Sequence, residues 1–170
     1  MSVDAVRDLL LAQLAEVRQD AVGQFEGLSE AQAHEHVGPG HKNMLGLLHH
    51  LTVACERFWV RAVFAADQQA VRDFRIDPAA PEGGVPWLVA PEVPTSQVID
   101  RYLGEVALVD DLLTRCDLDE PVRWWPLWRS DQRPVSLAEV VLAVILETAS
   151  HNGQLAGARH LLVGSGVTHH

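Results

Sequence analysis

Hydrophobic side chains recur every three or four residues along four long segments of the chain, which is the spacing of an amphipathic helix. The segments cover residues 3–22, 43–66, 95–116 and 136–163. No segment shows the strict alternation of hydrophobic and polar residues that is typical of half-buried strands. The pattern therefore predicts an all-α fold, a four-helix bundle in which each helix buries one stripe. In chain order the stripes are Val6, Leu9, Leu10, Leu14 and Val17; Leu47, His50, Leu51, Ala54, Phe58 and Arg61; Val98, Ile99, Tyr102, Val106, Val109, Leu112 and Leu113; and Leu137, Val141, Val144, Thr148, His151, Leu155 and Leu162.

Several polar residues mark the starts of helices. Asn43 is expected to cap the second long helix, because its side chain can accept a hydrogen bond from a free N–H group of the first turn. Ser29 with Gln32 forms the pattern of a capping box, which predicts a short extra helix between the first two segments. Ser136 with Glu139 repeats this pattern at the start of the fourth segment.

Two connections between the helices are long. Residues 67–94 are rich in proline and glycine, with Pro78, Pro81, Gly83, Gly84, Pro86 and Pro91. Residues 117–135 hold three tryptophans, Trp124, Trp125 and Trp128. Connections of this length exclude a series of tight hairpins. We expect one four-helix-bundle domain over residues 1–163 and a disordered tail over residues 164–170.

The composition fits a single globular domain that stays in solution. Hydrophobic residues make up 48% of the 170 positions and charged residues 21%, which argues against disorder. No hydrophobic run reaches the ~20 residues of a membrane span, and the first residues lack the pattern of a signal peptide. The two cysteines, Cys55 and Cys116, stand in hydrophobic helical patterns and are expected to be reduced. These features predict a cytoplasmic protein without a membrane partner.

The charge of the chain argues against nucleic acid as a partner. Thirteen Lys and Arg residues stand against 23 Asp and Glu residues, which gives a formal net charge of −10 at pH 7. Such a chain repels a phosphate backbone, and no local cluster of Lys and Arg offsets the repulsion. The partners to consider are therefore small molecules and other copies of the chain.

Candidate metal ligands stand in the second and fourth segments. Glu147 and His151 are four residues apart, so they project from the same face of a helix and can reach one ion. His50, on the inward stripe of the second segment, is the best third ligand, since His49 points about 100° away around the helix. Two imidazoles and one carboxylate match catalytic zinc sites and non-haem iron sites. The alternative is a hydrogen-bonded Glu–His pair and an ordinary core histidine, which spacing alone does not exclude.

The segments around these residues resemble the DinB/YfiT-like superfamily. The two stretches that carry the resemblance are residues 47–51, Leu-Leu-His-His-Leu, and residues 147–154, Glu-Thr-Ala-Ser-His-Asn-Gly-Gln. The resemblance covers nearly the whole chain and implies a four-helix bundle with a metal at its centre, often as a homodimer. Many relatives carry histidine where this chain has Glu147, but the mycothiol-dependent maleylpyruvate isomerases are similar to it in using a His, Glu, His set. The resemblance therefore gives the ligand roles to His50, Glu147 and His151.

The resemblance implies a metal-dependent thiol transferase or isomerase. Its cosubstrate would be a low-molecular-weight thiol of the mycothiol or bacillithiol class. A divalent metal, zinc before nickel or iron, would lower the pKa of that thiol, and the thiolate would attack an electrophilic carbon. Four arginines are candidates for binding the thiol, or else are ordinary surface residues: Arg57, Arg61, Arg129 and Arg133.

Two other functions stay open on the sequence. A metal-bound water would make a hydrolase, with Glu56 or Glu139 as the general base, although both are expected to be solvated helix residues. The other alternative is a non-catalytic metal-binding module linked to stress, which would act through a partner or through dimerisation. The sequence assigns no catalytic or thiol-binding residue, and the tryptophans are expected to pack against the core rather than to line a pocket.

Overall fold

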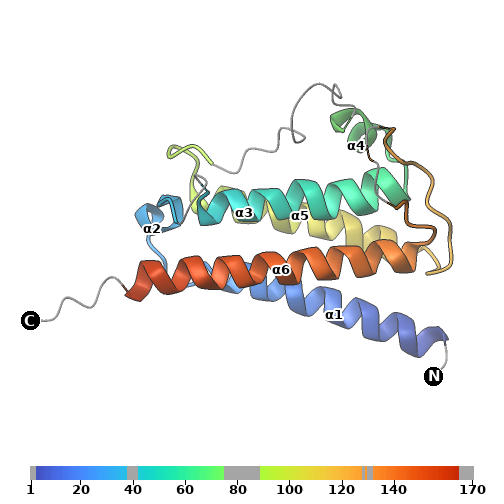
Figure 1. Cartoon of the computed structure of the whole chain (residues 1–170), viewed down its shortest axis with the longest axis horizontal. Helices are drawn as coiled ribbons and strands as arrows, with labels where there is room; N and C mark the ends of the chain where they lie inside the picture. Colours follow the sequence, from blue (N-terminus) through green and yellow to red (C-terminus); the bar gives the residue numbers. More distant parts are fainter. Residues whose placement is uncertain (1–2, 38–41, 75–88, 128, 130–131, 165–170) are drawn as a thin grey trace, which may run out of the picture.

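The computed structural model describes residues 3–37, 42–74, 89–127, 129 and 132–164, and it confirms the all-α fold (Figure 1). The elements in chain order are α1 (Val3–Gly23), α2 (Glu30–His34), α3 (Met44–His50), the π-helix η1 (Leu51–Phe64), α4 (Gln68–Asp73), α5 (Thr95–Leu113) and α6 (Leu137–Gly164). Pairing of the β type within the described residues is limited to two isolated bridges, His36 with Asn43 and Pro121 with Ser136.

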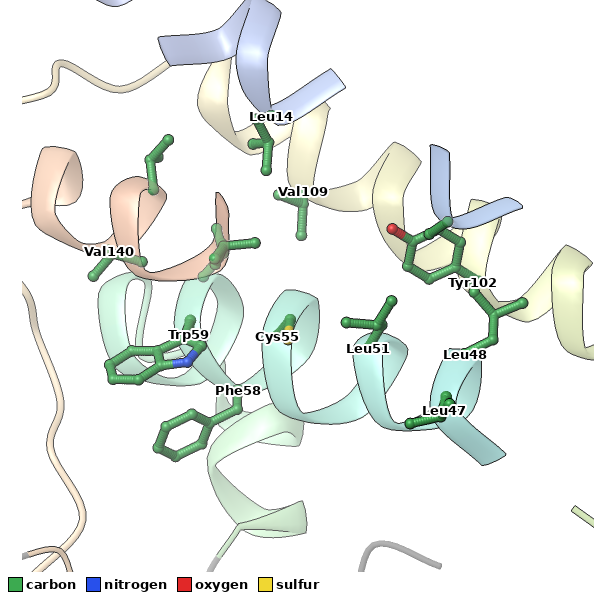
Figure 2. Packing of buried hydrophobic residues seen from close by; sticks show 14 of the residues in the cluster. Leu14, Leu47, Leu48, Leu51, Cys55, Phe58, Trp59, Tyr102, Val109 and Val140 are labelled. Carbon is green, nitrogen blue, oxygen red and sulfur yellow. The ribbon is translucent and has the colours of Figure 1, made fainter. Parts of the chain in front are cut away.

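Within the described residues, four long helical rods make up the bundle, and α3 with η1 forms one of these rods (Figure 1). Helix α6 packs against both α1 and the α3–η1 rod, and α5 packs against the same rod. The short helices lie near opposite ends of this rod, α2 against α3 and α4 against η1 (Figure 1). Side chains from all four rods meet in one buried cluster, to which Leu14, Leu48, Tyr102 and Val140 belong (Figure 2). The α3–η1 rod is therefore the central element of the fold.

The helix starts follow the capping signals of the sequence. Asn43 Oδ1 accepts a hydrogen bond of 2.7 Å from the N–H of Gly46 at the start of α3. The expected capping box is present at the start of α2. At α6 the box is displaced by one residue: Ser136 Oγ accepts from the N–H of Glu139, whereas the Glu139 carboxylate accepts from the N–H of Val135. Side-chain acceptors thus satisfy N–H groups that a helix start leaves without a partner.

The π-helix η1 is the main departure from the prediction of one continuous α-helix in the second segment. A π-helix hydrogen-bonds five residues apart, so each of its turns takes more residues than the 3.6 of an α-helix. The buried positions therefore shift along the rod. Leu51, Cys55 and Trp59 are buried (Figure 2). Ala54 and Arg61, which the α-helical stripe predicts to be buried, are half-buried.

The connection after η1 begins with α4, a helix that the sequence pattern does not predict. The Asp67 carboxylate caps it by accepting a hydrogen bond of 2.8 Å from the N–H of Ala70. The prolines at 78, 81 and 86, the glycines at 83 and 84, both Trp87 and Trp128, and the tail over residues 165–170 lie outside the described residues. In the part of the chain that the structure describes, no helix has the length and hydrophobicity to cross a bilayer.

Candidate metal site

His50 and His151 face each other across the interface between the α3–η1 rod and α6. His50 is the last residue of α3, and His151 lies near the middle of α6. Their ring centroids are 4.7 Å apart and the ring planes are inclined by 69°. Both side chains are half-buried. The structure thus brings two of the three predicted ligands, 101 positions apart in the sequence, into direct contact.

Glu147 stands one helical turn before His151, and its carboxylate contacts Cys55 of η1. The Cys55 thiol donates a hydrogen bond to Glu147 Oε2 with an Sγ–Oε2 distance of 3.4 Å. Among the described residues, no three His, Cys, Asp or Glu side chains form a group arranged to hold a metal ion. The three predicted ligands therefore lie at one interface between helices, with the carboxylate engaged by a thiol.

The surroundings of the two imidazoles favour their neutral form, which is the form that binds metals. Burial, followed by the charges of His151 and Lys42, lowers the pKa of His50 to about 4. Burial also lowers the pKa of His151, against the opposite effect of the Glu147 carboxylate. At pH 7 both rings are therefore neutral and present nitrogen lone pairs.

His49 lies in different surroundings from His50. Burial lowers the pKa of His49, and the positive charges of Arg101 and Arg57 lower it further. Arg101 belongs to α5, so His49 lies near α5 whereas His50 contacts α6. The structure therefore pairs His50, and not its neighbour, with His151.

The residues after His151 hold the fourth helix in place. Asn152 Nδ2 donates a hydrogen bond of 2.8 Å to the main-chain carbonyl of Val17 in α1. A hydrogen bond with the Gln154 side chain raises the pKa of His151 and thereby opposes part of the effect of burial. Hydrogen bonds of this kind orient the imidazoles of metal sites. The segment His-Asn-Gly-Gln thus contributes one candidate ligand and two residues that fix its position.

A comparison with known families identifies the family of the chain. Residues 9–164 match the family model described as Mycothiol-S-transferase. The chain belongs to the mycothiol-S-transferase family. This family is of the DinB/YfiT-like type, so the resemblance carried by residues 47–51 and 147–154 is confirmed. No curated protein matches the chain.

A crystal structure of a conserved protein from Enterococcus faecalis shares the fold. The two chains are 20% identical with a TM-score of 0.59, over 94% of this chain and 98% of that chain. A likeness at this level of identity shows the fold alone. It supports a helical bundle for this member of the mycothiol-S-transferase family.

The sequence prediction missed a buried ion pair beside the candidate site. Arg18 of α1 binds Glu56 of η1 through two hydrogen bonds, Nε to Oε1 at 2.8 Å and Nη2 to Oε2 at 2.5 Å. Arg18 is 5% exposed and Glu56 is fully buried. Arg18 Nη1 also donates to Asp110 Oδ1 of α5 at 2.7 Å. The sequence gives a single indication of this ion pair, which is that Arg18 directly follows Val17 of the first hydrophobic stripe.

The prediction that Glu56 is solvated is therefore wrong. The wide turn of η1 brings this residue into the core, where the Arg18 guanidinium compensates its charge. The other candidate base, Glu139, is exposed and accepts a hydrogen bond from the N–H of Val135 at the start of α6. Both carboxylates that the hydrolase alternative relied on thus have structural partners away from the two imidazoles.

Three of the arginines considered for thiol binding in this mycothiol-S-transferase family member donate hydrogen bonds to other residues of the chain. Arg57 and Arg61 of η1 both donate to Glu105 of α5, at 3.0 and 2.7 Å, and this carboxylate is 4% exposed. Arg133 donates to the carbonyl of Val122 at 2.9 Å. The contacts of Arg57 and Arg61 join η1 to α5. The contact of Arg133 joins two parts of the second long connection.

The fourth arginine, Arg129, holds the second connection against η1. Its guanidinium lies over the rings of Phe58, Trp59 and Trp125, at 5.2, 5.0 and 5.4 Å from their centroids. Both Trp124 and Trp125 are half-buried and pack against the hydrophobic core. The expectation that the tryptophans serve packing is confirmed for these two and for buried Trp59.

Proposed function

We propose that this member of the mycothiol-S-transferase family is a metal-dependent thiol S-transferase whose metal is held by His50, Glu147 and His151. The observation that carries the proposal is the contact of two neutral imidazoles from different helices, with a carboxylate one turn before the second. Two imidazoles and one carboxylate are the donors of catalytic zinc sites that keep one position open. Nickel and iron accept the same donors, so zinc is the first metal to test and these are the next.

The donor residues suit a divalent cation in kind, and their positions on two facing rods support the proposal. Glu147 and His151 share one face of α6 because they are four residues apart, and the His50 ring contacts His151 from the opposing rod. The contact with Cys55 uses Glu147 Oε2. A carboxylate has two oxygens and binds a cation through either or both of them. The hydrogen bond to the thiol is therefore compatible with metal binding.

A bound metal would supply one piece of chemistry, the lowering of a thiol pKa so that a thiolate forms at neutral pH. The residues of the chain do the remaining work. His50 and His151 serve as neutral donors, and Glu147 adds a single negative charge. Lys42, whose positive charge acts on both imidazoles, favours an anionic sulfur beside them. The family match favours mycothiol over bacillithiol as the thiol, and the second substrate is an electrophile that accepts the sulfur at carbon.

Elemental analysis of purified protein and its variants tests the ligand set. We expect near-stoichiometric zinc in the wild type and loss of zinc in His50→Ala and His151→Ala, because two remaining protein ligands make a weak site. His49→Ala is the matched control and should keep its metal, since His49 lies near α5. Circular dichroism should show that all variants stay helical. Metal retained in both ligand variants would refute the assignment.

Conjugation of mycothiol to a chromogenic aryl halide tests the reaction. We expect turnover by the metal-loaded wild type, loss of turnover with a chelator, and recovery on adding zinc. Bacillithiol tested in parallel decides between the two classes of thiol. A protein that binds zinc stoichiometrically but conjugates neither thiol to several electrophiles would favour the non-catalytic metal-binding module.

A further inference from the structure

The thiol of Cys55 lies at the candidate site, in contact with the proposed ligand Glu147. It is fully buried and lies along η1 between Leu51 and Trp59 (Figure 2). Its Sγ donates to Glu147 Oε2 at 3.4 Å. We propose that Cys55 is a positioning residue: its hydrogen bond holds the Glu147 carboxylate at the interface where the two imidazoles meet. This inference rests on the proposed function, in which Glu147 is a metal ligand.

The first support is the register between the two helices. His50 contacts His151, and Cys55, five residues later, contacts Glu147, four residues earlier. Two contacts thus follow one another along the antiparallel rods α3–η1 and α6. On an α-helix, residues five apart are separated by about 140° around the axis, and Cys55 would face away from α6. The wider turn of η1, which begins directly after His50, brings the thiol to the side that the imidazole occupies.

The second support is the chemistry of a carboxylate at a helix interface. A half-buried carboxylate loses part of its hydration and needs donors in the protein. A thiol is a weak donor without charge, so it orients the carboxylate and leaves its negative charge available to a cation. Arginine would satisfy the same oxygen but neutralise it, as Arg18 does for Glu56 one residue further along η1. The Cys55–Glu147 contact therefore suits a carboxylate that binds a cation, and the Arg18–Glu56 contact suits a carboxylate whose charge is neutralised in the core.

A titration with zinc tests the inference in protein stripped of metal. Competition against a chromogenic chelator gives the affinity of the wild type, Cys55→Ala, Cys55→Val and Cys55→Ser. Loss of a hydrogen-bonded partner of a ligand lowers metal affinity by about 10–100-fold, and we expect that loss for Cys55→Ala and Cys55→Val. Cys55→Ser should bind within a few-fold of the wild type, because its hydroxyl restores the donor. Cys55→Val keeps most of the side-chain volume, so its agreement with Cys55→Ala excludes a packing effect.

The control variant is Cys116→Ala, which removes the other cysteine, a half-buried thiol beyond the end of α5. Its affinity for zinc should equal that of the wild type. Equal affinity in all three Cys55 variants would overturn the inference and leave the proposed function intact. Equal loss in Cys55→Ser and Cys55→Ala would also overturn it, since the donor would then make no difference. A wild type that binds no divalent metal would overturn the proposed function and this inference together.

Cobalt substitution separates a positioning thiol from a thiol that binds the metal itself. A thiolate ligand gives Co²⁺ an intense sulfur-to-metal charge-transfer band, and we expect the wild type to show none. A band that disappears in Cys55→Ser would make Cys55 a ligand and overturn the positioning role. The infrared S–H stretch of Cys116→Ala, which retains Cys55 alone, tests the contact without any metal. It should move when Glu147→Gln is added, and an unmoved band would overturn the hydrogen bond on which the inference depends.

Discussion

Removal of the Arg18 guanidinium should destabilise the protein far more than removal of an exposed arginine. The substitution Arg18→Met keeps the bulk of the side chain and leaves Glu56 in the core without the two hydrogen bonds at 2.8 and 2.5 Å. Breaking a buried ion pair by removing one partner costs about 3–5 kcal/mol. For a domain of this size that cost corresponds to a decrease in Tm of roughly 6–20 °C. Thermal unfolding followed by circular dichroism measures it directly.

The destabilisation should depend on pH in a defined direction. Burial raises the pKa of Glu56 in the folded protein, and the hydrogen bonds and charge of Arg18 lower it again in part. In Arg18→Met the lowering is lost, so the folded-state pKa rises further above the unfolded value. A carboxyl group whose pKa is raised by folding costs stability at pH values above its unfolded pKa, and the full cost is reached above its folded pKa. The loss caused by Arg18→Met should therefore be greatest at neutral and alkaline pH and should shrink as the pH falls toward the unfolded value of about 4.3.

Two further variants decide whether the buried charge is the cause. Arg115→Met removes an exposed arginine paired with Asp111 four residues before it, and should cost about 0.5 kcal/mol or less. The double variant Arg18→Met with Glu56→Leu replaces the pair by hydrophobic side chains and should recover most of the lost stability. A cost below about 1 kcal/mol for Arg18→Met at pH 7, or no recovery in the double variant, would refute the reasoning.

Four further outcomes follow from the structure. Asn43→Ala should cost about 1 kcal/mol in chemical denaturation, because it removes the N-cap of α3. Ala66→Gly should raise the free energy of unfolding by up to about 1 kcal/mol, because residue 66 has φ of 53° at the end of η1. Arg129→Ala should increase quenching of Trp125 fluorescence by iodide, since the guanidinium joins the loop to η1. In metal-free protein, the NMR titration of His50 should have its midpoint at about 4. Because folding lowers the pKa of His50, the stability that its neutral ring contributes is present above pH about 6.5 and is lost as the pH falls toward 4.

The sequence predicts the bundle well because the periodicity of 3.6 residues holds in most of it. Val98, Tyr102 and Val109 of α5 are buried, as are most members of the stripe in α6. The same periodicity places His50 and His151 on inward faces, and the structure puts the two rings in contact. These are local properties of single helices, which is why a pattern along the chain is enough to predict them.

The residues that the sequence missed depend on features that are not local. The residue pattern does not indicate that a π-helix begins at Leu51. An α-helical model of this segment therefore predicts that Cys55 and Glu56 point away from the residues that they contact in the structure. Arg129 contacts the rings of Phe58 and Trp59 on η1, which stand about 70 positions earlier in the sequence. No rule based on residue spacing connects positions that far apart. Contacts of this kind follow from how the rods are rotated against one another.

That rotation is fixed at three successive residues of η1. Cys55 contacts Glu147 of α6, Glu56 binds Arg18 of α1, and Arg57 binds Glu105 of α5. Consecutive residues of a helix point in different directions around its axis, so the three contacts hold the rod from three sides. A rotation of η1 that preserved one contact would break the other two, and one of those is a buried charge pair. The geometry at the candidate metal site is therefore maintained by three contacts of η1, two of which lie outside the site, and a weakened Arg18–Glu56 pair should loosen metal binding as well as the fold.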